Sequence, residues 1–258
     1  EEDPKRVSWE LIKSVTEDRR AWERHLSEIL ALSEVDVGAI RDRGIRVALD
    51  CVNGVGGPAM AELLSELGCK VEAIGMNPDG RFPRDPEPTA SNLSELCSLV
   101  RDTGADIGFA VDPDADRLSL VDENGKAMGE DLTLAFAASV VLSRTVGPVV
   151  TNLSTSQVLN DVADSFSAPL MRTPVGEINV AERMIAEGAV IGGEGNGGVI
   201  LPALHHTRDA PLAAALILQH LIDVGSSPSI AAQVWPSYCI IKEKISFPRE
   251  ALPGAYQV

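Results

Sequence analysis

The chain has 258 residues, 45% of them apolar and 4% aromatic, which allows one large domain or two ordinary ones with aliphatic cores. Its formal net charge of −16 gives an acidic surface that repels nucleic acid and anionic membranes, so neither is expected as a partner. An anionic substrate is still allowed, because a binding site can be locally positive.

The cysteines and the longest apolar runs exclude further classes of protein. The cysteines lie at irregular spacings without a C-x-x-C pair, which argues against zinc binding and a redox dithiol and favours a reducing, cytoplasmic location: Cys51, Cys69, Cys97 and Cys239. The apolar runs at 132–142 and 210–222 are too short to span a bilayer, so they predict buried helices.

The first half of the chain predicts a helix followed by alternating strands and helices. Residues 8–32 place Trp9, Trp22 and Ile29 near one helical face, as an amphipathic helix would. Strands are expected at 45–49, 70–74, 106–111 and 118–121, with helices ending at Leu67, near 103 and near 143. A proline-rich loop covers 76–90.

The second half repeats this order. Strands are expected at 148–151, 170–172, 189–192 and 199–201, and helices at 156–165, 176–187 and about 209–224. Strands separated by helices imply largely parallel sheets that are covered on both faces. The expected fold is therefore α/β, with two similar three-layer α/β/α units that have mixed, mainly parallel sheets, at 44–146 and 147–225. Residues 1–43 are a helical lead-in, and 226–258 form a connecting segment.

Two polar loops occupy equivalent places in the two units. DPDADR (112–117) and GEGNGG (193–198) each follow the third strand of their unit. In open α/β sheets, ligands bind beyond the carboxyl ends of the strands. Both loops are therefore expected to line a cleft, which the two units could share.

The first loop predicts a metal site. Asp112, Asp114 and Asp116 stand at alternate positions, so their carboxylates can converge on one hard cation such as Mg²⁺. A solvated acidic turn is the simplest alternative, although the loop directly follows a buried strand. A calcium EF-hand loop does not fit, because Arg117 stands where that motif needs glycine.

A phosphatase is the more serious alternative for this loop. Aspartyl phosphatases of the haloacid dehalogenase type also place D-x-D after a buried strand. There Asp112 would be the nucleophile and Asp114 an acid/base. That pattern continues with Thr or Val where this chain has Asp116.

Two glycine-rich turns have both a functional and a structural interpretation. Glu194 and Asn196 of GEGNGG suit paired sugar hydroxyls, but the loop could also be an ordinary tight hairpin. GVGG (54–57) could hold a phosphate at a helix N-terminus. It lacks the G-x-G-x-x-G spacing, which favours a simple strand-to-helix turn.

The segment at 205–209 is expected to be structural. His205 and His206 are interpreted as a lone pair without a third ligand, which favours a capping or surface role. Arg208 and Asp209 are expected to open the following helix, with Asp209 near its positive end.

Together these motifs resemble the α-D-phosphohexomutase family, whose members include phosphomannomutase, phosphoglucomutase and phosphoglucosamine mutase. The resemblance covers nearly the whole chain and rests on the ordered loops DPDADR and GEGNGG. Supporting segments are DCVNGVGG (50–57), PDGRFPRDPEP (78–88), RTPVGEINVAERM (172–184) and GGEGNGGVILP (192–202). Family members have four domains, and this chain resembles the second and third, with a lead-in from the first and a connection toward the fourth.

The resemblance implies a function and roles for the loops. The family moves a phosphoryl group between the 1- and 6-positions of a hexose through a phosphoserine and a bisphosphorylated sugar. The three aspartates would hold Mg²⁺, which bridges to the phosphoserine, and Arg117 would help to neutralise it. The sugar-binding residues would be Glu194, Gly195, Asn196 and Gly197.

Two departures from the family pattern matter. Thr89-Ala90-Ser91-Asn92 resembles the family's serine loop, but Asn92 and Glu95 have the spacing of a capping box, so a helix cap is expected there. Many members also have a basic residue near the position of Ile178. The phosphoserine and the fourth domain's phosphate loop are expected outside this chain, which alone should be inactive. A phosphatase or a non-catalytic sugar-phosphate-binding module are the competing functions.

Overall fold

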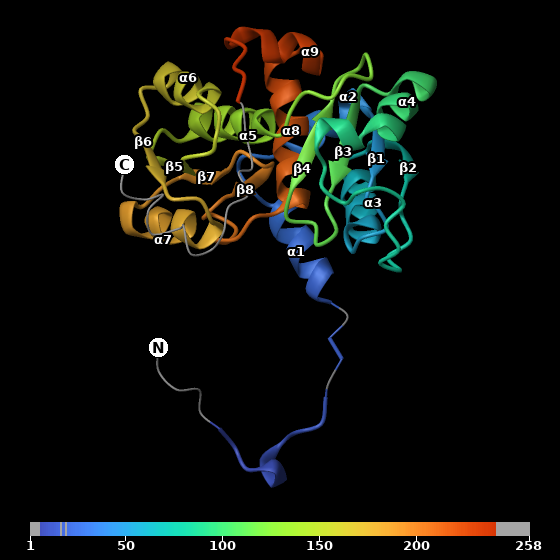
Figure 1. The fold of residues 1–258 in the computed structure, drawn as a ribbon, viewed down its shortest axis with the longest axis vertical. Coiled ribbons are helices and arrows are strands. Elements are labelled where there is room, and N and C mark those ends of the chain that lie inside the picture. Colours follow the sequence, from blue (N-terminus) through green and yellow to red (C-terminus); the bar gives the residue numbers. More distant parts are fainter. Residues whose placement is uncertain (1–5, 16, 19, 241–258) are drawn as a thin grey trace, which may run out of the picture.

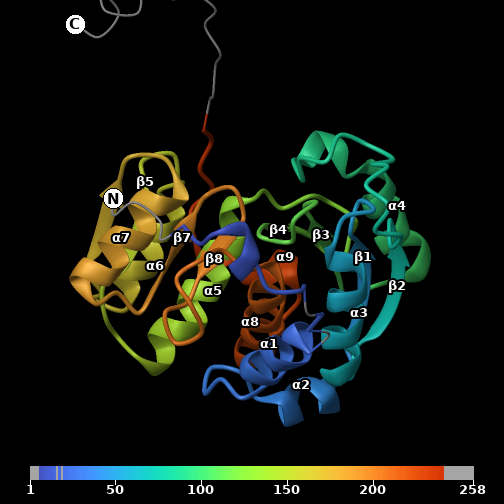
Figure 2. The same ribbon diagram turned by 90° about the horizontal axis from the view of Figure 1, so that it is seen from below.

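Two four-stranded sheets lie side by side with helices around and between them (Figure 1). The computed structural model describes residues 6–15, 17–18 and 20–240. The expected fold class is confirmed: each sheet is mixed and mainly parallel, and helices lie on its faces. Seen from below, α8 (Ala210–Val224) stands between the two sheets, with α1 (Ala21–Leu30) and α2 (Val37–Arg43) at its end (Figure 2).

The first sheet has the strand order β2-β1-β3-β4. Its strands are β1 (Arg46–Asp50), β2 (Lys70–Ile74), β3 (Ile107–Val111) and β4 (Leu118–Val121), and only β4 runs antiparallel to its neighbour. The crossover helices are α3 (Gly56–Glu66) and α4 (Ser94–Thr103). Every residue of β3 is buried, as expected for a central strand of a sheet covered on both faces.

The second sheet repeats this topology with the order β6-β5-β7-β8. Its strands are β5 (Val149–Asn152), β6 (Leu170–Thr173), β7 (Ile191–Glu194) and β8 (Gly198–Ile200), and β8 is again the antiparallel edge. The helices α6 (Val158–Ser165) and α7 (Glu177–Glu187) connect the parallel strands. Because β3 and β7 occupy the same place in their sheets, the loops after them leave equivalent edges.

The two sheets share a core. The apolar runs form α5 (Asp131–Arg144) and α8, which are largely buried as the sequence predicted and pack against each other. Both helices also contact β4 and β8, so one hydrophobic cluster extends through both units. Within the described residues, no single helix is long and apolar enough to cross a membrane. Among the described helices, α8 and Pro228–Val234 would together have the length and apolar composition of a membrane span, but the two are bent from each other by 79°.

Backbone contacts also join the two units directly. Arg117, just before β4, forms an isolated antiparallel bridge with Gly198 at the start of β8. The Leu118 N–H donates to the Gly197 carbonyl at 3.0 Å, and the Ala210 N–H donates to the Ala115 carbonyl at 3.0 Å. The end of the aspartate loop (DPDADR, 112–117) and the start of β4 are therefore joined to the glycine loop (GEGNGG, 193–198) of the other unit.

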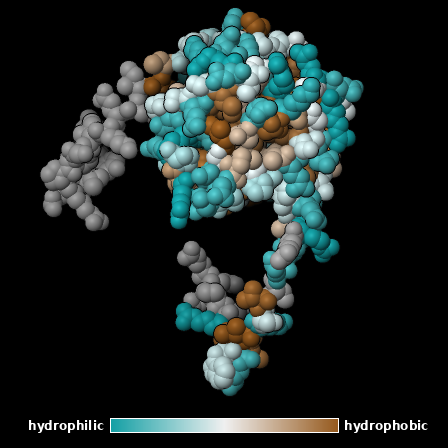
Figure 3. All heavy atoms as spheres, turned by 90° about the vertical axis from the view of Figure 1, so that its right-hand side faces the viewer, coloured by the Kyte–Doolittle hydropathy of each residue, from teal (hydrophilic) through white to brown (hydrophobic). Residues whose placement is uncertain are grey.

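The expected long helix at 8–32 is wrong in its first part. Residues Trp9–Leu11 form a short 3₁₀ turn, and the helix begins only at Ala21. Figure 1 shows the described N-terminal residues extending away from the body of the molecule, and Figure 3 shows hydrophobic side chains uncovered there. Trp9 and Ile12 are 78% and 70% exposed, whereas Leu26 and Ile29 of α1 are buried. Short helices are stable mainly when an apolar face packs against the protein. The apolar side chains of this segment have no such surface to pack on, so their helical spacing does not produce a helix.

The expected capping box at Asn92 is also wrong. Asn92 belongs to a 3₁₀ turn, and its side-chain amide donates to the Glu87 carbonyl at 2.9 Å. The helix α4 begins at Ser94, and its N-cap residue Leu93 offers no side-chain hydrogen bond. Asn92 therefore lies one residue ahead of the N-cap position, and its amide nitrogen binds the proline-rich loop. After α8 the described chain continues through α9 (Pro228–Ala231) and the 3₁₀ turn Ala232–Val234.

We predict that Gly197→Ala destabilises the protein more than a matched glycine substitution. Gly197 and Gly225 both have positive φ, at 93° and 63°. A Cβ at Gly225 meets nothing within 4 Å, whereas one at Gly197 overlaps the Leu118 carbonyl at the junction of the sheets. Gly225→Ala should cost about 1 kcal/mol of unfolding free energy, and Gly197→Ala about 3 kcal/mol or more. Urea denaturation measures both free energies of unfolding. Equal losses in the two variants would show that the chain is not closely packed around Gly197.

Candidate functional site

The aspartate loop is built around the buried carboxylate of Asp112. Asp112 follows β3 and is fully buried. Its Oδ1 accepts the backbone N–H groups of Asp116 and Arg117, both at 3.0 Å, and its Oδ2 accepts Nε of Arg117 at 2.6 Å. Ala115 has a φ of 61°, which turns the loop back on itself. These bonds fix the loop as a tight wrap around Asp112.

The three predicted metal ligands do converge. Asp112, Asp114 and Asp116 each offer a carboxylate oxygen, and these oxygens lie within 4.8 Å of one another. Asp114 is exposed and Asp116 is partly buried, so the group opens toward solvent on one side. Burial, with the charge of Asp112 close by, raises the pKa of Asp116 to about 7. Three clustered carboxylates of this kind fit a hard divalent cation, which would compete with a proton on Asp116.

Arg117 connects this loop to the proline-rich loop. Its Nε bonds to Asp112, and its Nη1 lies 2.6 Å from a carboxylate oxygen of Glu87. Glu87 is a site residue that the sequence interpretation did not name, and it lies within PDGRFPRDPEP. The contact explains why that segment accompanies the aspartate loop: its carboxylate holds the outer end of the guanidinium.

The strand-to-helix turn at 54–57 supports the same loop. The Val55 N–H donates to the Pro113 carbonyl at 2.9 Å. Gly54 lies so close that a Cβ there would be only 2.6 Å from the Cα atom of Pro113. The turn is therefore packed against the aspartate loop, in agreement with the structural interpretation of GVGG.

The glycine loop is more buried than its composition suggested. Glu194 at the end of β7 is 4% exposed. Its Oε1 accepts Nδ2 of Asn152 at 2.7 Å and the Gly176 N–H at 3.2 Å. The Gly195 N–H donates to Oγ1 of Thr155 at 2.9 Å. Only Asn196 is partly exposed within 193–198, so it is the side chain of this loop that a ligand can reach most directly.

One arginine joins the two loops. The guanidinium of Arg208 forms an ion pair with Asp116 through Nη2 and with Glu194 through Nη1, the latter at 2.9 Å. Its Nε lies 3.4 Å from Oε2 of Glu177, and the Arg208 backbone N–H donates to Oε1 of the same residue at 2.9 Å. The Arg208 side chain is only 17% exposed. A planar, five-donor cation is suited to this triple contact, because it can bind carboxylates on separate edges.

Sequence reasoning missed the role of Arg208. It placed the residue only at the start of the last helix, where Asp209 does act as N-cap: its Oδ1 accepts the Leu212 N–H at 2.8 Å. A signal for this role was present in the sequence. Two loops that were expected to face each other carry Asp116 and Glu194, and these carboxylates repel unless a cation lies between them. Ile178, near which the family has a basic residue, is 65% exposed. Its neighbour Glu177 instead binds Arg208.

The domain order of one known family matches this chain. “Phosphoglucomutase/phosphomannomutase, alpha/beta/alpha domain II” matches residues 23–125, and domain III of the same family matches residues 129–238. The fold and the paired loops define a phosphohexomutase-type pair of domains. The chain belongs to the phosphoglucomutase/phosphomannomutase family and contains its second and third domains.

Individual relatives agree with this assignment. A “Probable phosphoglucosamine mutase” of Methanopyrus kandleri is 37% identical over 248 residues, which are 95% of this chain and 54% of the relative. A “Phosphoglucomutase/phosphomannomutase” of Thermococcus kodakarensis is 41% identical over 214 residues, 82% of this chain and 47% of the relative. A solved phosphoglucomutase/phosphomannomutase family protein of Burkholderia thailandensis matches with a TM-score of 0.74 at 26% identity, covering 84% of this chain and 46% of that one. The chain spans about half the length of the relatives it matches.

We predict that Arg208→Ala lowers the free energy of unfolding by about 3 kcal/mol, because three partly buried carboxylates lose their shared cation. Arg208→Lys should restore less than half of this, since an ammonium group cannot bind as a fork. The control is Arg144→Ala, which removes a more exposed pair with Asp223 and should cost no more than about 1 kcal/mol. Chemical denaturation of the three variants checks this. Equal losses in the two alanine variants would show that Arg208 is only a surface charge.

Proposed function

We propose that these domains form the metal- and sugar-binding centre of a Mg²⁺-dependent phosphohexomutase. The full-length enzyme would interconvert hexose 1-phosphates and hexose 6-phosphates through a phosphoserine and a bisphosphorylated sugar. The observation that carries the proposal is the join between the loops, in which Arg208 contacts Asp116 on one side and Glu194 on the other. A metal and a sugar bound at these loops would share one cleft. The names of the relatives supply the substrate class.

The aspartate loop is proposed to hold the metal. Asp112, Asp114 and Asp116 would bind Mg²⁺ through oxygen atoms, the ligands that this ion prefers. The bound ion would act as a Lewis acid toward a phosphoryl oxygen. Arg117, already fixed by Asp112 and Glu87, would present its guanidinium to the phosphate of the phosphoserine.

The glycine loop is proposed to hold the sugar. Asn196 is partly exposed and would bind a sugar hydroxyl directly, with the backbone groups of Gly195 and Gly197 beside it. Glu194 is occupied by Asn152, Gly176 and Arg208, so it would contribute a carboxylate that is already oriented. Because these polar groups are already held in place, little free energy is needed to reorient them when a substrate binds.

Asp116 favours the mutase over the phosphatase alternative. The phosphatase pattern has Thr or Val at this place, whereas Asp116 here lies with Asp112 and Asp114 in one group of carboxylate oxygens within 4.8 Å of one another. Three converging carboxylates suit a metal-ligand set, in which none of them has to act as a nucleophile. The phosphoserine and the phosphate-binding loop of the reaction would come from further domains of the same polypeptide, so the chain alone would be inactive.

The cysteines support the proposed cytoplasmic location. All four have free thiols in the structure. Burial raises the pKa of Cys51 to about 12, so this thiol is unreactive. Cys239 is exposed, and a free exposed thiol also fits a reducing compartment.

We predict that the chain binds one Mg²⁺ weakly and that Asp114→Asn abolishes binding, while Asp102→Asn, at an exposed position outside the loop, has no effect. Because the pKa of Asp116 is raised to about 7, a proton competes with the ion below that pH. Affinity should therefore rise with pH and level off above neutrality, falling by up to about tenfold per pH unit below it. Calorimetry between pH 5.5 and pH 8 measures this. Unchanged affinity in Asp114→Asn would remove the site assignment.

We predict turnover only in the full-length polypeptide. It should convert glucose, mannose or glucosamine 1-phosphate into the 6-phosphate, whereas the purified chain should not. In the full-length protein, Asn196→Ala should lower kcat/KM by roughly fivefold, since a neutral hydrogen bond is worth about 1 kcal/mol, and should leave Mg²⁺ affinity unchanged. Sustained mutase activity of the isolated chain would contradict the proposal and direct attention to Ser91.

A further inference from the structure

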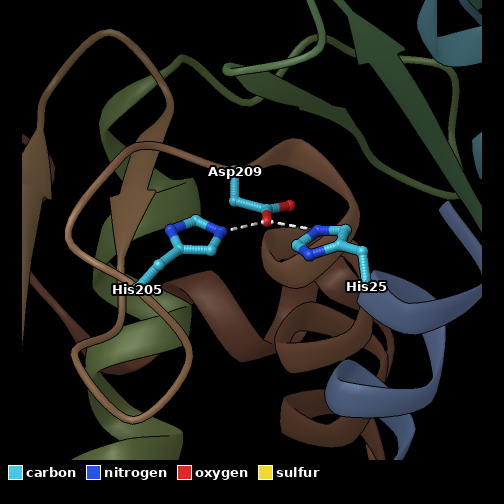
Figure 4. A group of neighbouring side chains, drawn as sticks. All are labelled: His25, His205 and Asp209. Carbon is cyan, nitrogen blue, oxygen red and sulfur yellow. Dashed lines mark hydrogen bonds and ion pairs between the residues drawn. The ribbon is translucent and has the colours of Figure 1, made fainter. Parts of the chain in front are cut away.

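A second cluster of metal-type ligands lies outside the aspartate loop. His25 comes from α1, His205 from the loop after β8, and Asp209 from the N-cap of α8 (Figure 4). The Nε2 atoms of His25 and His205 lie 2.7 and 2.9 Å from the same atom, Oδ2 of Asp209. The two imidazole rings stand on either side of the carboxylate and are stacked, with centroids 5.5 Å apart.

We propose that His25, His205 and Asp209 bind a divalent transition-metal ion of the zinc class. Two imidazole nitrogens and one carboxylate oxygen are a donor set that Zn²⁺ takes in proteins, with a fourth position left for water. The three ligand atoms lie within 4.8 Å of one another. The sequence argued against zinc binding because it has no C-x-x-C pair. The fold nevertheless brings together two histidines that are distant in the sequence.

The geometry needs only a small change to accept the ion. Bonds of about 2.0–2.2 Å in a tetrahedron put neighbouring ligand atoms about 3.3 Å apart. The two imidazole–carboxylate distances are now 2.7 and 2.9 Å, so each must lengthen by about half an ångström. The histidine side chains are 27% and 32% exposed, which leaves them room to rotate. The metal would take the place of the hydrogen-bonded protons between the rings and the carboxylate.

The groups around the ligands orient the carboxylate and one imidazole. Oδ1 of Asp209 is held by the Leu212 N–H, which leaves Oδ2 directed at the two imidazoles. Nδ1 of His205 lies 3.0 Å from Oγ1 of Thr207 and accepts the Thr207 backbone N–H at 3.3 Å, which places the proton of this ring on Nε2. Metal binding at Nε2 would move that proton to Nδ1, where Oγ1 of Thr207 can accept it and the backbone contact is lost.

The charge of Asp209 supports a cation at this place. Its side chain is only 6% exposed, yet among the described residues no lysine or arginine forms an ion pair with it. The two imidazoles and the Leu212 N–H now compensate its charge through hydrogen bonds, and a divalent ion would take over the part of the imidazoles. Because Asp209 follows Arg208 directly, the ion would also tie α1 to the segment that joins the two loops.

Cobalt titration of the purified chain tests the proposal. With millimolar Mg²⁺ present to occupy the aspartate loop, Co²⁺ should bind one equivalent and produce the visible absorption of a four-coordinate imidazole site, and Zn²⁺ should displace it. His25→Ala and His205→Ala should each weaken Zn²⁺ binding at least about tenfold. His206→Ala, which changes the exposed neighbour, and Asp114→Asn should leave it unchanged.

A ligand exchange distinguishes a metal site from a hydrogen-bonded tether. His205→Cys should recover Co²⁺ binding relative to His205→Ala and add a thiolate-to-cobalt charge-transfer band in the near ultraviolet, because a thiolate binds such ions well. Far-UV circular dichroism of each variant verifies that it is folded. A wild-type chain without the visible cobalt band, or folded His25→Ala and His205→Ala variants with wild-type Zn²⁺ affinity, would overturn the proposal.

Discussion

The contacts of one guanidinium group hold the two polar loops together. Arg208 lies between Asp116 and Glu194, which belong to different sheets, and it also reaches Glu177. In a chain with a net charge of −16, carboxylates brought this close repel unless a cation lies between them. A lysine could neutralise one of these groups, but only the planar fork of arginine can bind them on separate edges.

The fold provides the position from which this arginine acts. Both sheets have the same strand order, so β3 and β7 release their loops at equivalent edges. The antiparallel strands β4 and β8 then bring those edges together, with the bridge between Arg117 and Gly198 at the junction. The buried helices α5 and α8 fill the space between the sheets. A shared core and a shared charge network thus fix the same relative orientation of the loops.

Local pattern predicted most of the fold and the members of each loop. The alternation of strands and helices was confirmed, because runs such as Ile107–Val111 are apolar throughout and short. The failures came where tertiary contacts outweighed local pattern: Trp9 meets no core, and the Asn92 amide binds Glu87 instead of capping a helix. Arg208 and His25 could not be placed, because their partners lie far away in the sequence and only the folded chain brings them together. The roles proposed for the site residues stay predictions.

The central claim is that the aspartate loop and the glycine loop face one cleft, and a paramagnetic ion can test it directly. Mn²⁺ added to isotope-labelled chain should bind at the aspartates and broaden the amide resonances of residues 114–117 and also those of 194–198. Asp114→Asn should abolish the broadening of both segments. Sharp resonances at 194–198 beside broadened ones at 114–117 would show that the two loops do not share a site.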